Sequence, residues 1–270
     1  MRLQQYLTEK TFNVNADVDL IWKELFKPSY DLFKRGKYDE FMSFIEKQRY
    51  ITSGELKSKQ AKEAHKINPI DIFLVYDNDG NFYDPTRKLI HLSYNYGVLD
   101  IMKQFNYNST HILRNVTMNK EVQDRFDNEV SEGAIKGTIY HEVSHWLNDT
   151  FHNKNISKLL IKAREEGNIN QLKQGHSNVN LTFYELDAQV HALKQLKRTY
   201  KKEYDNFGYE DIIKYKSSFL GVFRAASRNK KEYDEFMKNF VKRLHREGLL
   251  TDKLKKIPSF NEMYRILSYL

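Results

Sequence analysis

The sequence contains no cysteine and only 4 prolines and 11 glycines in 270 residues. Without cysteine the chain can form neither disulfides nor thiolate metal sites, and a reducing cytoplasm is its natural compartment. The scarcity of proline favours long uninterrupted helices, because proline breaks a helix interior. Aromatic residues are plentiful, with 18 Tyr and 17 Phe, so the chain can fill a sizeable core.

A long apolar run is also missing. A membrane-spanning helix needs roughly 18 apolar residues, and the most apolar run here is residues 72–76. The first twenty residues lack the apolar segment of a signal peptide. We therefore expect a cytoplasmic protein without a membrane partner. The richness in Lys, Asn, Ile, Tyr and Phe resembles proteins of AT-rich genomes, including phage genomes, in which case the cytoplasm would be that of the host.

The net charge of +8 raises the question of a nucleic-acid partner. Lys and Arg are, however, mostly interleaved with Asp and Glu, and no arginine-rich stripe stands out. This pattern favours a solvated basic surface over a nucleic-acid interface. A nucleic-acid partner stays open but is not favoured, and the sequence does not indicate an oligomeric state.

Residues 17–66 are expected to be helical. Both DVDLIWKELF and YDEFMSFIEKQ carry apolar residues at three- and four-residue spacing, which is typical of amphipathic helices. Further along, Thr52 or Ser53 precedes Glu55 in a pattern that predicts a helix start.

Two β-rich runs follow, at residues 70–76 and 88–94, separated by a turn signal at 77–80. They predict a β-hairpin or two neighbouring strands of a small sheet. Helical periodicity then returns in seven segments: 98–106, 132–152, 156–174, 182–204, 209–226, 230–247 and 259–269. A short sheet with many helices predicts an α+β fold that is mainly helical.

The segment TIYHEVSHWLND, residues 138–149, carries the pattern H-E-x-x-H. Residues four apart share one face of a helix, so His141 and His145 can direct their imidazoles at a single ion, as zinc ligands must. Glu142 lies beside that point, where it could take a proton from a water molecule. The alternative is a surface helix with two unrelated histidines.

The residues around the motif support a helix that packs against a core. An apolar stripe lies on one side, while His141 and His145 project to the other. The stripe consists of Ile135, Ile139, Val143, Trp146 and Leu147.

Two histidines do not complete a tetrahedral site. If the helix continued, His152 would lie about 10 Å along its axis from His145, too far for a shared ion. The metzincin pattern requires Gly and His where this chain has Asn148 and Phe151. Asp149 is also too far along the helix to be a ligand. It either orients a histidine or is an ordinary solvated polar residue of the helix.

A third ligand is available in TFYELDAQVHALKQL, residues 182–196. One face of this expected helix is apolar, formed by Phe183, Leu186, Val190 and Leu193. Glu185 lies nearly opposite, on a face otherwise lined by Ala188 and Ala192. Small residues let two helices approach closely, so Glu185 is the preferred ligand and Asp187 the alternative.

His141-Glu142-x-x-His145 followed by Glu185-x-x-Ala188, after 39 intervening residues, resembles the gluzincin pattern. The second helix is also similar to that of the short ImmA/IrrE-like metallopeptidases of phages and bacteria. The resemblance covers roughly residues 68–200. The chain departs from it in the longer gap and in Gln189, which replaces an acidic residue of thermolysin-like enzymes.

The resemblance implies a zincin-like core with a small sheet, an active-site helix, and an edge strand along which an extended peptide lies, here residues 88–94. It implies Zn²⁺ held by His141, His145 and Glu185, with Glu142 as the general base. The oxyanion donor would be Tyr184, His176 or His191, and Tyr184 is taken as the catalytic candidate.

We therefore expect a zinc metallopeptidase acting on a protein or peptide. Its core would span residues 67–200, flanked by helical extensions at 1–66 and 201–270, unless all three form one compact unit. Two alternatives stay open. One is a noncatalytic binding or structural protein on a zincin fold, for example of phage origin. The other is a nucleic-acid-associated SprT-like protease, whose third ligand would be a histidine such as His176.

Overall fold

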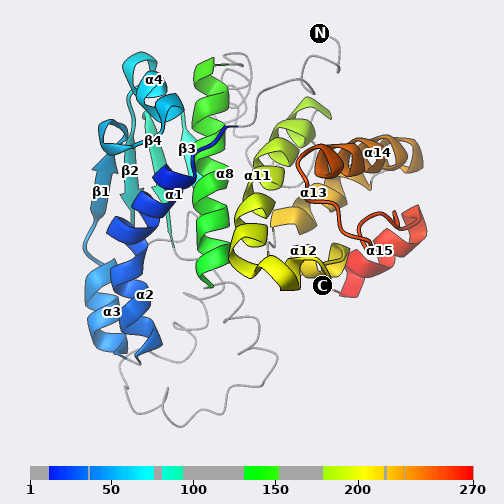
Figure 1. Ribbon diagram of the computed structural model, residues 1–270, viewed down its shortest axis with the longest axis horizontal. Helices are drawn as coiled ribbons and strands as arrows, with labels where there is room; N and C mark the ends of the chain where they lie inside the picture. The colour runs from blue at the N-terminus through cyan, green and yellow to red at the C-terminus, as the bar shows by residue number, and fades with distance from the viewer. Residues whose placement is uncertain are drawn as a thin grey trace. The chain divides into compact units, whose positions relative to one another are not determined.

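The computed structural model describes residues 12–35, 37–75, 81–93, 131–151, 179–215, 218–227 and 229–269 (Figure 1). The chain forms two compact units. One is Asn13–Asn153, and the other combines Met1–Phe12 with Lys154–Leu270. The structure is mainly helical with a small four-stranded mixed sheet, which confirms the α+β expectation at that level. The helices predicted at 98–106 and 156–174 and the turn at 77–80 lie outside the described residues, and the predicted division into three parts stays a prediction.

The sheet of the first unit has the strand order β1-β2-β4-β3. Its strands are β1 (Arg49–Thr52), β2 (Asp71–Leu74), β3 (Phe82–Asp84) and β4 (Leu89–Leu92). β2 and β4 pair in parallel, whereas β1 pairs antiparallel with β2, and β3 with β4.

The two strands predicted from the sequence are therefore neighbours, but the hairpin alternative is wrong, because the hairpin partner of β4 is β3. The expectation that residues 88–94 form the edge strand is also wrong, because β4 lies between β2 and β3. β3 has only three residues, too few to show an alternating pattern in the sequence. Because β3 pairs with β4 on the side away from β2, the second predicted strand lies inside the sheet.

The N-terminal helices are α1 (Asn15–Ile21), the π-helical turn η2 (Trp22–Phe26), α2 (Lys27–Lys34), α3 (Tyr38–Ile45) and α4 (Lys59–Ile67). The predicted helical stretch 17–66 is interrupted by β1 and by a 3-10 turn, η3 (Ser53–Glu55). Thr52 and Glu55 do form a capping box, yet it caps only that single turn. α4 begins after Ser58, whose hydroxyl accepts a hydrogen bond from the Ala61 amide at 3.0 Å.

A buried carboxylate holds α4 in place. Asp17 of α1 is fully buried, and its Oδ1 accepts hydrogen bonds from the backbone amides of Lys57 at 2.6 Å and Ser58 at 2.9 Å. A carboxylate at a helix N-terminus satisfies amides that have no partner within the helix and lies at the positive end of the helix dipole.

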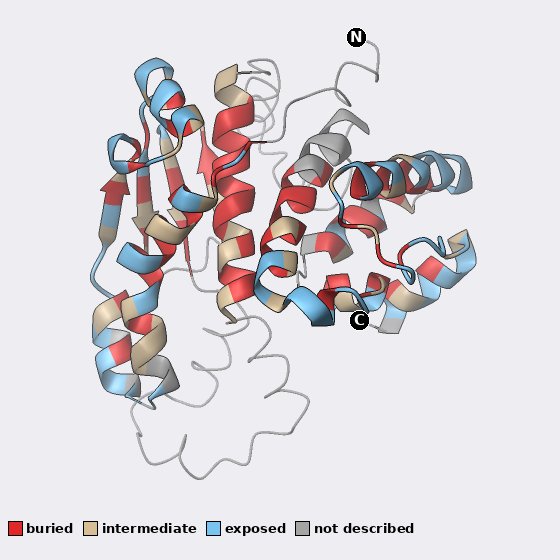
Figure 2. Cartoon of the chain, in the orientation of Figure 1, coloured by how far each residue is buried: buried red, intermediate tan, exposed pale blue. Residues whose placement is uncertain are grey.

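α8 (Glu132–Phe151) coincides with the helix predicted at 132–152 and is the central helix of its unit. It packs against α1, α4, β3 and β4, and Figure 2 shows it buried along most of its length. Near its N-terminal end, Lys136 forms ion pairs with Glu132 at 2.6 Å and with Asp19 of α1 at 2.9 Å. The helix is therefore anchored to the N-terminal helices by charge as well as by apolar packing.

A group of hydrogen bonds fixes the C-terminal end of α8. The Trp146 indole donates to the backbone oxygen of Asn68 at 2.9 Å, and the Tyr83 hydroxyl of β3 donates to Asp149 Oδ2 at 2.8 Å. The Asn68 amide donates to the Tyr83 hydroxyl at 3.1 Å and to the Thr150 hydroxyl at 3.3 Å. Burial raises the pKa of the Tyr83 phenol above its usual range, and the charge of Asp149 raises it further. Tyr83 is therefore protonated and available as a donor.

The second unit contains α11 (Val179–Tyr204), α12 (Tyr209–Tyr215), α13 (Ser218–Ala226), α14 (Lys230–Arg246) and α15 (Phe260–Tyr269). These helices match the sequence prediction, except that the helix predicted at 209–226 is two helices. Their core is rich in aromatic rings, including Tyr204, Phe219, Phe223, Tyr233 and Phe240. Among the helices of the described ranges, none combines the length and apolar character that a membrane crossing needs.

Polar contacts join α11 to the chain at the end of α14. Lys194 forms an ion pair with Glu247 at 2.6 Å, and Lys197 donates to the backbone oxygen of Gly248 at 2.7 Å. A lysine near the C-terminal end of a helix satisfies carbonyls that have no partner within the helix and is favoured by the helix dipole.

We predict that Tyr83→Phe lowers the free energy of unfolding by about 1–3 kcal/mol, because it removes a donor from a half-buried carboxylate. Urea denaturation of the whole protein measures this change. Tyr50→Phe is the matched control, because Tyr50 is 61% exposed, and a surface change of this kind shifts stability by no more than about 0.5 kcal/mol. Equal stability of the two variants would show that the Tyr83–Asp149 bond does not hold α8.

Candidate metal centre

The two motif histidines of α8 face each other. Their Nε2 atoms are 2.9 Å apart, their ring centroids are 4.5 Å apart, and their planes are inclined at 87°. Four-residue spacing on a helix places His141 and His145 one turn apart on the same side. The sequence prediction that the two imidazoles converge is therefore confirmed in the geometry of the helix.

Glu142 completes a compact group of possible ligand atoms. Its Oε1 lies 3.8 Å from His141 Nε2, and one ligand atom from each of the three residues falls within 4.8 Å of the others. Among the residues that the structure describes, this is the one group of at least three histidine or acidic side chains close enough to hold an ion.

The group is buried, with exposed fractions of 8% for His141, 4% for Glu142 and 5% for His145. Burying polar groups costs free energy unless they are paired or bind an ion. Two neutral imidazoles at this distance can share one proton, or they can direct both lone pairs at one cation. Buried ionisable groups gathered in this way are typical of functional sites.

The donor set fits zinc. Imidazole nitrogen is a preferred zinc ligand, and two such nitrogens on a tetrahedral ion lie about 3.3 Å apart. The Nε2 atoms of His141 and His145 are 2.9 Å apart. Moving them apart by about 0.4 Å would bring them to the spacing of two zinc ligands. Small rotations of the two rings about their side-chain bonds supply such a movement without displacing α8.

The helix surface around the pair is more extensively buried than the sequence pattern predicted. Every residue of the predicted apolar stripe is buried, and so are Tyr140, Ser144 and Asn148 on other sides of α8. Ser144 donates to the Tyr140 backbone oxygen at 2.7 Å. Asp149, one turn beyond His145, accepts a hydrogen bond from Tyr83. It thus connects α8 to β3.

The predicted third ligand lies on the second unit. Glu185, together with Tyr184 and the alternative ligand Asp187, belongs to α11, but these three side chains lie outside the described part of the structure. The face assignment of that helix is confirmed for its described residues. Leu186, Val190 and Leu193 belong to the core, while Ala188 and Ala192 are fully buried outside that cluster.

Four other residues were named in the sequence analysis as possible parts of the site or its surroundings, and the structure describes two of them. His191 of α11 is buried, with its ring centroid 6.4 Å from that of Phe12 in the same unit. Gln189, at the position where an acidic residue would support a histidine, is also buried. His152 and His176 lie outside the described residues.

Two residues that position the site were missed by sequence reasoning. Asn68 occupies the end of α4, and Tyr83 lies in the three-residue strand β3. Neither residue belongs to a motif, and their contacts with Trp146 and Asp149 span 66 or more positions along the chain. No local pattern in the sequence could have indicated them.

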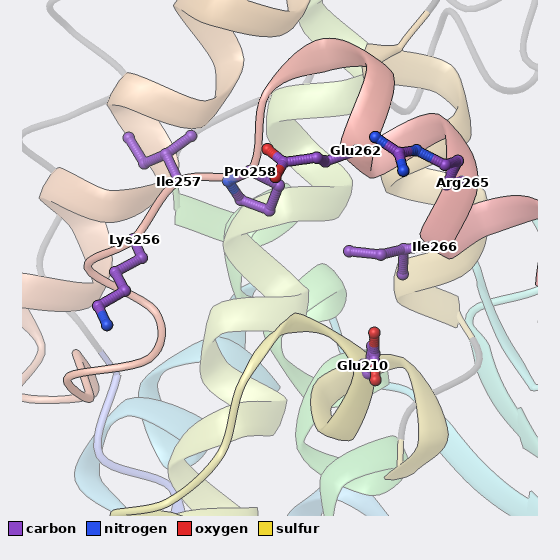
Figure 3. A pocket seen from close by; sticks show the side chains of 7 residues that line it. All are labelled: Glu210, Lys256, Ile257, Pro258, Glu262, Arg265 and Ile266. Carbon is purple, nitrogen blue, oxygen red and sulfur yellow. The ribbon is translucent and has the colours of Figure 1, made fainter.

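The second unit has a groove of about 740 Å³ beside α15 (Figure 3). It is lined by Glu210, Lys256, Ile257, Pro258, Glu262, Arg265 and Ile266. Glu262 is engaged in capping α15, since its Oε2 accepts from the Ser259 amide at 2.7 Å. The charged side chains of the groove are solvent-exposed, and the residues lining it include no histidine. The groove is therefore a weaker candidate than the buried pair on α8.

Comparison with known proteins finds no match: no protein-family model, no curated protein and no solved structure is similar to this chain. The site is thus defined by its own geometry, two converging histidines and a glutamate on a buried helix.

Proposed function

We propose that the protein is a zinc-dependent metallopeptidase that hydrolyses peptide bonds in a protein or peptide substrate. The observation that carries this proposal is the buried pair of His141 and His145, with nitrogens 2.9 Å apart and Glu142 beside them. A metal site kept only for structure needs ligands but no base, and the presence of Glu142 therefore favours catalysis.

Each residue of the group has a distinct role. His141 and His145 hold the ion through Nε2, and Glu185 is proposed as the third ligand. When bound, zinc supplies a Lewis acid that activates water and polarises a carbonyl. The Glu142 carboxylate takes a proton from the attacking water and delivers it to the leaving amine. Tyr184 is the proposed donor to the oxyanion.

The substrate would bind as an extended strand. Among the described strands, β3 lies at one edge of the sheet, and it packs against α8. Extended peptides commonly add to such an edge through main-chain hydrogen bonds. β3 thereby takes the role that the sequence had assigned to residues 88–94. The zincin-like core would then combine this strand with α8, in a protein of the cytoplasm.

We predict about one zinc ion per chain in the protein purified without an affinity tag, measured by elemental analysis. His145→Ala and Glu185→Ala should each lose most of this zinc while the far-ultraviolet circular dichroism persists. His245→Ala is the control, because it removes an exposed histidine of the other unit. A wild-type protein without zinc, even after incubation with it, would favour a noncatalytic binding protein.

We also predict that Glu142→Gln retains zinc but lowers peptide hydrolysis by at least about a hundredfold, because the amide cannot accept the proton from water. Mass spectrometry of a pool of random ten-residue peptides incubated with each protein measures the cleavage. Glu235→Gln is the control, because it changes an exposed glutamate of α14 in the second unit. Undiminished cleavage by the Glu142 variant would exclude the proposed mechanism.

A further inference from the structure

The positive charge of the protein is divided unequally between its two units. The second unit contains 26 Lys and Arg against 15 Asp and Glu, whereas the first contains 18 against 21. The second unit therefore has a formal net charge of +11 and the first of −3. Whatever ion pairs form within the second unit, its own carboxylates cannot neutralise this surplus. A surplus of this size creates a positive potential that attracts polyanions.

The C-terminal half of α14 presents part of this surplus to solvent (Figure 2). Lys238, Lys242, His245 and Arg246 are all exposed, and they follow one another at offsets of four, seven and eight residues from Lys238. This spacing places the four side chains along one side of the helix, which we call the basic face of α14. Neither Lys238 nor Lys242 forms an ion pair with a residue that the structure describes. Their ammonium groups are therefore open to a partner.

The opposite side of α14 holds the helix in place. Five of its residues belong to the core of the unit: Tyr233, Phe236, Met237, Phe240 and Leu244. Glu247 follows the helix and pairs with Lys194 of α11 at 2.6 Å. The basic face thus lies on a helix that is already fixed, so a partner that binds it does not have to order the backbone.

The helix dipole does not account for these cations. It favours positive charge at the C-terminal end of a helix, but the effect falls off within the last turn. α14 ends at Arg246, so Lys242 lies just before that turn and Lys238 lies one turn earlier. These two lysines carry charge at positions where the dipole does not favour it.

We propose that the basic face of α14 binds a nucleic-acid duplex through its phosphates. Contacts of Lys and Arg with phosphates give affinity without sequence preference. A protein or membrane partner would require an apolar anchor, and none of the exposed large apolar side chains of the described residues lies on α14. A single strand would in addition require aromatic rings on which its bases stack. The inference goes beyond the proposed function, since neither zinc nor peptide hydrolysis enters it.

The test is the affinity of the full-length protein for a short fluorescently labelled DNA duplex of mixed sequence, measured by anisotropy. A face that contacts about three phosphates should lose roughly fortyfold in affinity when the salt concentration rises from about 50 to about 200 mM. Lys238→Gln combined with Lys242→Gln should weaken binding at the lower salt concentration by at least about tenfold and reduce its salt dependence, because two phosphate contacts are lost.

The matched control combines Lys214→Gln on α12 with Lys253→Gln in the segment before α15. It removes the same charge from exposed positions on other elements of the same unit, and it should leave the affinity close to that of the wild type. Far-ultraviolet circular dichroism shows whether both double variants are folded.

Equal weakening by the two double variants would overturn the inference, because the duplex would then respond to the overall charge of the unit and not to the basic face. So would the absence of binding by the wild-type protein at the lower salt concentration, or tighter binding of a single strand of the same length. A poly-glutamate peptide that binds more tightly than the duplex would overturn it in favour of an acidic protein partner.

Discussion

The burial of α8 is the constraint on which the rest of the first unit depends. A helix surrounded by other elements must satisfy each polar side chain from within the protein, because water cannot do so. Lys136 is paired near one end, and Trp146, Asp149 and Thr150 are bonded near the other. His141 and His145 lie between these anchors, so their geometry is set by a helix that is held at both ends.

The sheet provides those anchors because of its strand order. Parallel pairing of β2 and β4 brings Asn68 and Tyr83 to the same end of α8, although 15 positions separate them. The same register places Ile51, Ile72, Ile90 and Tyr83 in one buried row across the strands. A shift of one residue in any strand would exchange its two faces, so the buried isoleucines and the bond from Tyr83 to Asp149 fix the register of the sheet.

The burial of two imidazoles so close together also has a chemical consequence. Nitrogens held 2.9 Å apart compete for one proton, which an ion can replace. Binding of an ion to such a pair would stabilise the folded state, since the unfolded chain has no preformed site. Glu142 lies beside the pair, and its position there is the reason that hydrolysis is proposed.

The sequence by itself determined the local features of this protein. Periodicity gave α8, α11 and the later helices close to their ends, and the four-residue spacing of His141 and His145 made their convergence a consequence of helix geometry. Only the tertiary structure decided which strand forms the edge, how β2 pairs with β4, and that Tyr83 and Asn68 fix α8. These features depend on contacts between distant segments, and β3 is too short to carry a pattern of its own, so no local regularity could reveal them.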